Sequence, residues 1–198
     1  MRSKESQGIV LLVSGPAGVG KTTVCEALLK EFSHRLQRAV TATTRAPREG
    51  ERDGVDYHFL SEKDFEFKVA KGDFYEHALV HGRLYGTLKT EVRQRLESGA
   101  DLLLNVDVQG AEAFRRAAEA DTLLAGRLCT VFLAPVGLDD LRARLSGRGT
   151  DSEEEIERRI KVAEAEMARS GEYDHCIVSS SKEEDLARAR ELYLSARG

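Results

Sequence analysis

The chain has 198 residues, of which 41% are hydrophobic and 32% are charged, and its formal net charge is −4. This length is enough for one domain with a full core. The negative charge argues against an overall field that would attract nucleic acid. No apolar run is long enough to span a membrane, and the first seven residues contain no signal-peptide core. We therefore expect a cytoplasmic protein with no nucleic-acid or membrane partner.

The first strong pattern in chain order begins at residue 9. Residues 9–14 are apolar and rich in β-branched side chains, which indicates a buried parallel strand. Residues 15–22 then match G-x-x-x-x-G-K-[ST], the phosphate-binding P-loop, and residues 23–30 show helical apolar spacing. Strand, glycine loop and helix N-terminus together form an anion site. The alternative, an ordinary glycine turn that carries a lysine, does not account for the flanking strand and helix.

This pattern predicts a site for a nucleoside triphosphate. Lys21 would reach the β- and γ-phosphates, and the hydroxyl of Thr22 would ligate Mg²⁺. We expect ATP to be bound by Gly15, Pro16, Ala17, Gly18, Val19, Gly20, Lys21, Thr22 and Thr23. The P-loop alone does not say which molecule receives the phosphate.

Three further strand patterns are each followed by a helical pattern. The expected strands are residues 102–106, 129–133 and 176–178, and the expected helices are residues 110–120, 137–145 and 182–196. Strands that alternate with helices predict a parallel sheet with right-handed crossovers.

Two segments interrupt this alternation. Residues 45–87 are rich in glycine, aspartate and aromatic residues and predict turns and short strands around a helix near residues 61–71. Residues 147–151 are a polar link, followed by a strongly charged helix from residue 152 to about residue 170. A core, a substrate-binding insertion and a hinged segment are typical of a small kinase.

The cysteines and histidines do not indicate a metal site. Cys25, Cys129 and Cys176 are widely spaced in apolar contexts, so we expect small buried side chains without disulfides. The five histidines are scattered and lack metal-binding spacing.

The segment after residue 40 contains the candidate acceptor site. Arg45 and Arg48 lie near the end of an expected strand, with Pro47 stiffening the loop between them. Guanidinium groups bind phosphate bidentately, although for this pair taken alone a solvated basic turn is the favoured interpretation. Tyrosine, glutamate and threonine motifs follow at residues 54–57, 74–76 and 85–87. Their order after a P-loop favours a binding site over isolated surface residues.

With these motifs the sequence resembles the guanylate kinase family, whose members phosphorylate GMP with ATP. The resemblance extends from residue 8 to about residue 193. Six family motifs occur in order: T-T-R-x-x-R at 43–48, G-x-D-Y at 54–57, F-x-E at 74–76, Y-G-[ST] at 85–87, D-x-Q-G at 107–110 and R-G-x-x-[ST]-E-E at 148–154.

The resemblance implies a role for each matching residue. The GMP phosphate would be held by Arg45, Arg48, Tyr57 and Tyr85. The base and ribose would be surrounded by Thr41, Glu76, Gly86, Thr87 and Asp107. Catalysis would depend on Lys21, Arg45, Arg48 and the lid arginines Arg144, Arg148 and Arg159. Gly147 and Gly149 flank Arg148 and suit a hinge that delivers it to the phosphates.

The chemistry of guanine supports the role of Glu76. Guanine presents N1–H and N2–H₂ side by side, so one carboxylate can accept from both, whereas N1 of adenine is an acceptor. A buried carboxylate left unpaired is costly, so adenine should be rejected strongly. Hydroxyls such as those of Thr41 and Thr87 can donate and accept, which suits O6 or N2.

The chain departs from the family pattern at a few positions. Ala17 replaces a usual serine, and Ser179 and Ser180 stand where the family often has an asparagine that contacts adenine. Asn105 replaces the first aspartate of a D-x-D pair. We therefore expect Asp107 to carry the acidic role at the end of the strand at residues 102–106. Positions two apart on a strand share a face, so the side chains of Asn105 and Asp107 should both face the cleft.

We predict a single α/β domain: a parallel-sheet P-loop kinase core with a small mixed α/β GMP-binding insertion and a helical lid. The core would comprise residues 8–40, 88–143 and 171–198, the GMP-binding part residues 41–87 and the lid residues 144–170. The expected reaction is ATP + GMP → ADP + GDP with Mg²⁺, without a covalent enzyme intermediate, and with dGMP as a further acceptor.

Two alternatives remain open at this point. One is a kinase for a different phosphorylated acceptor, against which Glu76 and the motif at residues 85–87 argue. The other is a non-catalytic guanylate-kinase-like interaction module, against which the intact P-loop argues.

Overall fold

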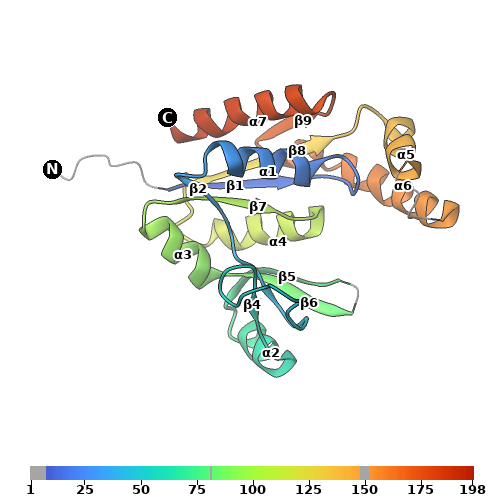
Figure 1. The fold of residues 1–198 in the computed structure, drawn as a ribbon. Helices are drawn as coiled ribbons and strands as arrows, with labels where there is room; N and C mark the ends of the chain where they lie inside the picture. The colour runs from blue at the N-terminus through green and yellow to red at the C-terminus, as the bar shows by residue number, and fades with distance from the viewer. Residues whose placement is uncertain (1–7, 81, 148–151) are drawn as a thin grey trace.

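The computed structural model describes residues 8–80, 82–147 and 152–198 (Figure 1). Its main feature is a five-stranded parallel sheet with the strand order β2-β7-β1-β8-β9. The strands are β1 (Val10–Ser14), β2 (Leu36–Arg38), β7 (Asp101–Asn105), β8 (Leu128–Ala134) and β9 (His175–Val178). Because β1 lies in the middle, the loop that follows it opens at the centre of the carboxyl edge of the sheet.

Helices cover both faces of this sheet. Figure 1 shows α1 (Lys21–Glu31) and α7 (Lys182–Arg197) on one side and α3 (Lys89–Glu97) and α4 (Val108–Glu119) on the other. Alternate residues of β1 pack into two separate core clusters, one on each face. This burial on both faces explains why β1 reads as a continuous apolar run.

A second, smaller sheet lies on the side of α3 and α4 (Figure 1). It has the order β4-β3-β6-β5, with mixed strand directions. The elements of this unit are β3 (Ala42–Thr43), β4 (His58–Phe59), α2 (Glu62–Ala70), β5 (Phe74–Val80) and β6 (Arg83–Leu88). The rings of Phe65 in α2 and Phe74 in β5 stack at 4.5 Å between centroids. Tyr75 packs against Phe114 of α4 at 4.6 Å, which fixes the smaller sheet to the core.

The remaining helices form a pair at the carboxyl edge of the main sheet. Leu141 and Leu145 of α5 (Leu138–Ser146) share a buried cluster with Ile156 and Ile160 of α6 (Glu153–Met167). The short 3₁₀ helix η1 (Ser170–Glu172) then leads into β9. The lid boundary expected at residue 144 falls inside α5, and the division into core, insertion and lid stays a prediction.

The expected strands and helices are confirmed, with ends that shift by one or two residues, or by three at the end of the charged helix. Two elements were missed: α3, whose apolar face is only Val92 and Leu96, and β2, which has three residues. The expectation that Cys176 is buried was wrong, because its side chain leaves the edge strand β9 towards solvent. In the described part of the chain, no helix is long and apolar enough to cross a membrane.

Candidate active site

The P-loop has the backbone conformation that its glycines permit. Gly15 has φ +138°, and a Cβ at this position would lie 2.2 Å from the carbonyl oxygen of Leu133 in β8. Gly20 has φ +112° and is the residue immediately before α1. Since side chains are strained at such φ values, the loop needs glycine at both positions. It leaves the N-terminus of α1 open towards a bound anion.

Lys21, the first residue of α1, folds over this loop. Its Nζ donates to the carbonyl oxygens of Gly15 at 2.5 Å and Pro16 at 2.9 Å. Burial lowers the pKa of Lys21, while the nearby carboxylates of Glu166 and Asp107 oppose that shift. A partly desolvated ammonium group is thus held where the loop would cradle a phosphate.

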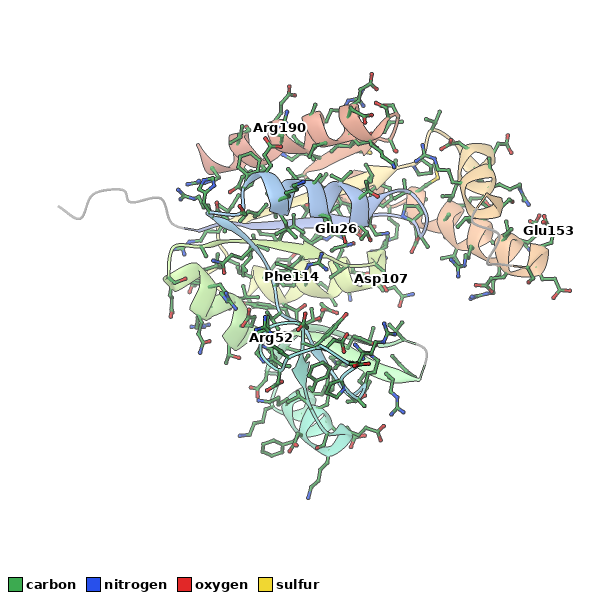
Figure 2. The ribbon with its side chains drawn as sticks, in the orientation of Figure 1. Glu26, Arg52, Asp107, Phe114, Glu153 and Arg190 are labelled. Carbon is green, nitrogen blue, oxygen red and sulfur yellow. The ribbon has the colours of Figure 1, made fainter. Side chains whose placement is uncertain are left out.

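The hydroxyl of Thr22 lies at the end of β7. Asn105 Nδ2 is 3.4 Å from Thr22 Oγ1. The strand ends at Asn105, so the expectation that Asp107 lies on the same strand face was wrong. Asp107 is instead the N-cap of α4, and its Oδ1 accepts from the backbone N–H of Gly110 at 2.7 Å. Figure 2 shows Asp107 at the end of α4 that lies nearer to α6.

Glu76 is a buried carboxylate in the smaller sheet. Its side chain accepts a 2.5 Å hydrogen bond from the hydroxyl of Thr87 on the neighbouring strand β6. Burial raises the pKa of Glu76, the Thr87 hydroxyl lowers it, and the charge of Asp107 raises it again. A Cβ at Gly110 would lie 3.5 Å from Glu76 Oε2 and 3.3 Å from Asp107 Oδ1. The two carboxylates therefore meet at the N-terminus of α4.

Arg45 is held by a carboxylate that the sequence analysis did not single out. Glu51 accepts from both terminal nitrogens of Arg45, at 2.9 and 2.8 Å, and from the backbone N–H of Arg48 at 2.7 Å. The guanidinium of Arg45 also lies 5.3 Å from the ring centroid of Tyr57. Tyr57 and Tyr85 are edge-on neighbours at 6.1 Å. A carboxylate three residues after a basic pair is the signal that could have identified Glu51.

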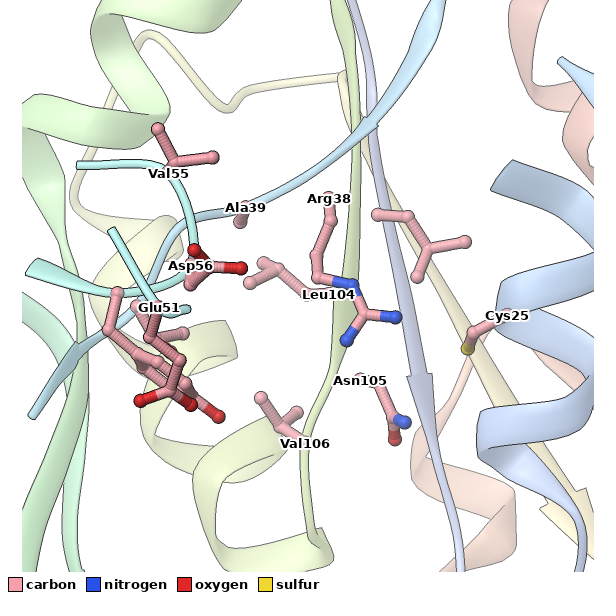
Figure 3. Close-up of a pocket in the computed structure, with 12 residues that line it drawn as sticks. Cys25, Arg38, Ala39, Glu51, Val55, Asp56, Leu104, Asn105 and Val106 are labelled. Atoms are coloured by element: carbon pink, nitrogen blue, oxygen red, sulfur yellow. The ribbon is translucent and has the colours of Figure 1, made fainter. Parts of the chain in front are cut away.

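A cavity of about 470 Å³ separates this cluster from the end of the main sheet (Figure 3). Thr41, Glu51 and Tyr57 line it from one side, and Arg38 and Asn105 line it from the other. Arg38, the last residue of β2, is a cation that the sequence analysis missed because β2 itself was missed. The cavity thus brings Thr41 and Tyr57 together with Asn105 at the end of β7. Glu76, Thr87 and Arg45 lie outside its lining.

The structure describes two of the three expected lid arginines. Arg144 lies beside the P-loop, where its Nη1 donates to the carbonyl oxygen of Val19 at 3.2 Å. Arg159 lies on α6 and pairs with Glu155 at 2.9 Å. Arg148 falls outside the described residues. Arg144 therefore already contacts the loop that it was expected to approach.

These features define a class of protein. A parallel α/β sheet with a P-loop after its central strand, with Lys21 in the loop and Arg144 beside it, is the core of a P-loop kinase. A second basic and aromatic cluster across a cavity suits a small phosphorylated acceptor.

Comparison with known proteins identifies the family within this class. The sequence model of guanylate kinase matches residues 7–195. The chain is 40% identical over 191 residues to a guanylate kinase of Novosphingobium aromaticivorans, covering 96% of this chain and 83% of that one. It is 43% identical over 179 residues to a guanylate kinase of Thiobacillus denitrificans, covering 90% and 82%.

A solved structure agrees with these relatives. The crystal structure of guanylate kinase from Anaplasma phagocytophilum superposes with a TM-score of 0.68 at 28% identity, covering 97% of this chain and 87% of that one. The chain belongs to the guanylate kinase family.

Proposed function

We propose that this protein transfers the γ-phosphoryl group of ATP to GMP, and also to dGMP, giving ADP and GDP or dGDP. The observation that carries the choice of acceptor is the buried Glu76, hydrogen-bonded to Thr87 beyond the basic cluster around Arg45. A buried carboxylate is costly unless it is paired, and the adjacent N–H groups of guanine supply two donors. The proposed location is the cytoplasm, where both nucleotides are available.

The ATP side of the site depends on the P-loop. Its backbone N–H groups would hold the phosphates, and Lys21 and Arg144 would neutralise the charge that shifts onto the leaving ADP. Each cation already contacts the loop through carbonyl oxygens. Gly15, Pro16, Ala17, Gly18, Val19, Gly20 and Thr23 complete the proposed ATP site.

Mg²⁺ fits the residues at this position if phosphate and water provide most of its ligands. Among the described residues, no group of three His, Cys, Asp or Glu side chains could hold a metal ion. The hydroxyl of Thr22 would supply one oxygen, and Asn105 would orient it. Such partial protein ligation is typical of Mg²⁺ in phosphoryl transfer, and the ion would supply positive charge that neutralises the phosphates.

The GMP side would bind the two ends of the nucleotide separately. Arg45, Arg48, Tyr57 and Tyr85 would hold the phosphate, and Thr41, Glu76, Gly86, Thr87 and Asp107 would surround the base and ribose. Fixing the acceptor phosphate in line with ATP makes positioning and charge stabilisation the main sources of rate. Arg148 and Arg159 would add positive charge around the moving phosphoryl group.

A steady-state assay with ATP, Mg²⁺ and a panel of nucleoside monophosphates tests this function. We expect kcat/KM for GMP to exceed that for AMP by at least ~10³, the scale of discrimination when a buried polar group is left unpaired. In Lys21→Ala, turnover should fall at least ~10³-fold while GMP binding survives, because only the ATP side loses its cation. Equal use of AMP and GMP, or near-normal turnover in Lys21→Ala, would contradict the proposal.

A further inference from the structure

Arg144 is the last charged residue of α5, and several partners fix its guanidinium group. Nη1 donates to the carbonyl oxygen of Val19 in the P-loop at 3.2 Å and to the hydroxyl oxygen of Ser179 at 3.1 Å. Nε lies 2.9 Å from Asp140 in an ion pair within the helix. The side chain thus connects α5, the P-loop and the end of β9.

The direction of the bond between Arg144 and Ser179 is set by a third residue. Ser179 is fully buried directly after β9, and its hydroxyl donates to Asp185 Oδ2 at 2.7 Å. A hydroxyl has one hydrogen, so this bond leaves only lone pairs of Ser179 to face Arg144. Asp185 is 4% exposed, and its other oxygen accepts from the backbone N–H of Ser180 at 2.9 Å. The carboxylate is therefore fixed at both oxygens.

Packing keeps α5 against the loop as well. A Cβ at Gly18 would lie 2.8 Å from Leu145 Cδ2 and 3.4 Å from Leu141 Cδ1. Both leucines are fully buried in the cluster that joins α5 to α6. Because the P-loop touches the helix at a residue without a side chain, α5 sits close enough for Arg144 to reach Val19.

One end of the guanidinium remains for a ligand. The contacts of Arg144 use both hydrogens of Nη1 and place Nε beside Asp140, and within the described ranges no residue accepts from Nη2. We propose that Ser179 and Asp185 are positioning residues that hold Arg144 against the P-loop, so that Nη2 is presented to the phosphates of ATP. This inference rests on the proposed role of Arg144 in ATP turnover.

It follows that Arg144 and Arg159 have different positions and partners. Arg144 is a fixed part of the ATP site, anchored through Ser179 to the N-terminal turn of α7. Arg159 lies on the other helix of the pair, α6, and is paired with Glu155. Ser179 acts through Arg144, so its removal should affect ATP and leave GMP unaffected.

The test combines binding, kinetics and a double-mutant cycle. In Ser179→Ala we expect the dissociation constant for ATP with Mg²⁺, measured by calorimetry without acceptor, to rise about 10-fold, with KM for GMP unchanged. Asp185→Asn should act in the same direction, since an amide has one acceptor oxygen where the carboxylate has two, one for the hydroxyl of Ser179 and one for the N–H of Ser180. In an Arg144→Ala background, Ser179→Ala should have no further effect, because the residue that it positions is gone.

A matched control separates positioning from general stability. Tyr193→Phe removes a buried 2.6 Å hydrogen bond from the tyrosine hydroxyl to the carboxylate of Asp101. Asp101 is the first residue of β7, whereas Asn105 beside the P-loop is the last. We expect it to lower Tm without changing ATP binding. The proposal is overturned if Ser179→Ala and Asp185→Asn, like the control, lower Tm without changing ATP binding. It is also overturned if the fold-increases in the ATP dissociation constant caused by Ser179→Ala and by Arg144→Ala multiply in the double variant. Since ATP binding is measured without GMP, a wrong acceptor assignment would not obscure the result.

Discussion

Glu76 combines a proposed recognition role with a cost to stability. Its carboxylate is 8% exposed, and the hydroxyl of Thr87 on the next strand donates to it. The charge of Asp107 at the N-terminus of α4 adds repulsion. Guanine N–H groups would relieve both effects, because they donate to the charged form.

Glu76→Gln should therefore weaken the use of GMP far more than that of ATP. The amide accepts one hydrogen bond but turns an NH₂ towards a donor of guanine. The resulting loss in kcat/KM for GMP should correspond to roughly 2–4 kcal/mol of transition-state stabilisation. Glu62→Gln, an exposed change on α2 of the same sheet unit, is the control. An unchanged KM for GMP together with an unchanged preference over AMP would show that Glu76 does not recognise the base.

The same substitution predicts a pH-dependent gain in stability. Because burial raises the pKa of Glu76, the folded state favours its protonated form, and the stability that this form provides is lost as pH rises through the raised pKa. Glutamine stays neutral, so Tm of Glu76→Gln minus Tm of the wild type should increase with pH. The difference should be smallest below the ordinary pKa of glutamate. Thermal melts across this range check the sign, and a difference that falls with rising pH would refute it.

Asp107 can be tested without disturbing the helix that it caps. Asparagine caps helices about as well as aspartate, so Asp107→Asn keeps the bond to Gly110 and removes only the charge. We expect kcat/KM to fall by more than ~10² with little change in Tm. Asn105→Asp, at the end of β7, should change kcat/KM less than ~10-fold. If Asn105→Asp is the damaging change and Asp107→Asn is silent, the acidic role has been assigned to the wrong residue.

Among the elements, the loop between β1 and α1 is the most constrained. Gly15→Ala would place a Cβ 2.2 Å from the carbonyl oxygen of Leu133, at φ +138°. Backbone strain of this kind costs of order 1–3 kcal/mol before the clash is counted, so ATP binding and Tm should both fall sharply. Gly72→Ala is the matched control, since Gly72 has φ +70° and no atom lies within 4 Å of a Cβ at this position. Normal ATP binding by Gly15→Ala would mean that the loop is not the phosphate site.

At the scale of the whole molecule, the proposed phosphate-binding groups lie on three separate units. Lys21 and Arg144 lie at the P-loop, Arg45 lies just after β3 of the smaller sheet and pairs with Glu51, and Arg159 lies on α6 and pairs with Glu155. Arg45 and Arg159 can neutralise the transferred group only if their units approach the loop. Binding of both nucleotides should therefore bring α6 and the smaller sheet towards each other.

Distance labels test this closure directly. Labels at exposed positions 63 on α2 and 154 on α6, in a chain whose exposed Cys176 is replaced by serine, should move closer when ATP analogue and GMP are both present. Each nucleotide alone is the control and should give a partial change. An unchanged distance with both nucleotides bound would argue against closure.

Patterns within short stretches of sequence determined the P-loop, four of the five strands of the parallel core and the family. Apolar periodicity and glycine spacing are local properties, and they identified β1, α1 and the strands that follow. Weak local signals failed for β2 and α3, where three residues or two apolar side chains carry the element. Resemblance supplied the proposed roles of Glu76 and Arg45, which local patterns do not distinguish from surface residues.

Only the tertiary structure decided which groups meet. Glu76 and Thr87 are 11 residues apart and become partners because β5 and β6 pair. Arg144 and Ser179 are 35 residues apart and meet because α5 packs on the P-loop beside the end of β9. Asp107 is the N-cap of α4 and does not share a strand face with Asn105, because β7 ends at Asn105. Each contact depends on how separate elements pack against each other. A local sequence pattern carries no information about the distance between two residues on different elements.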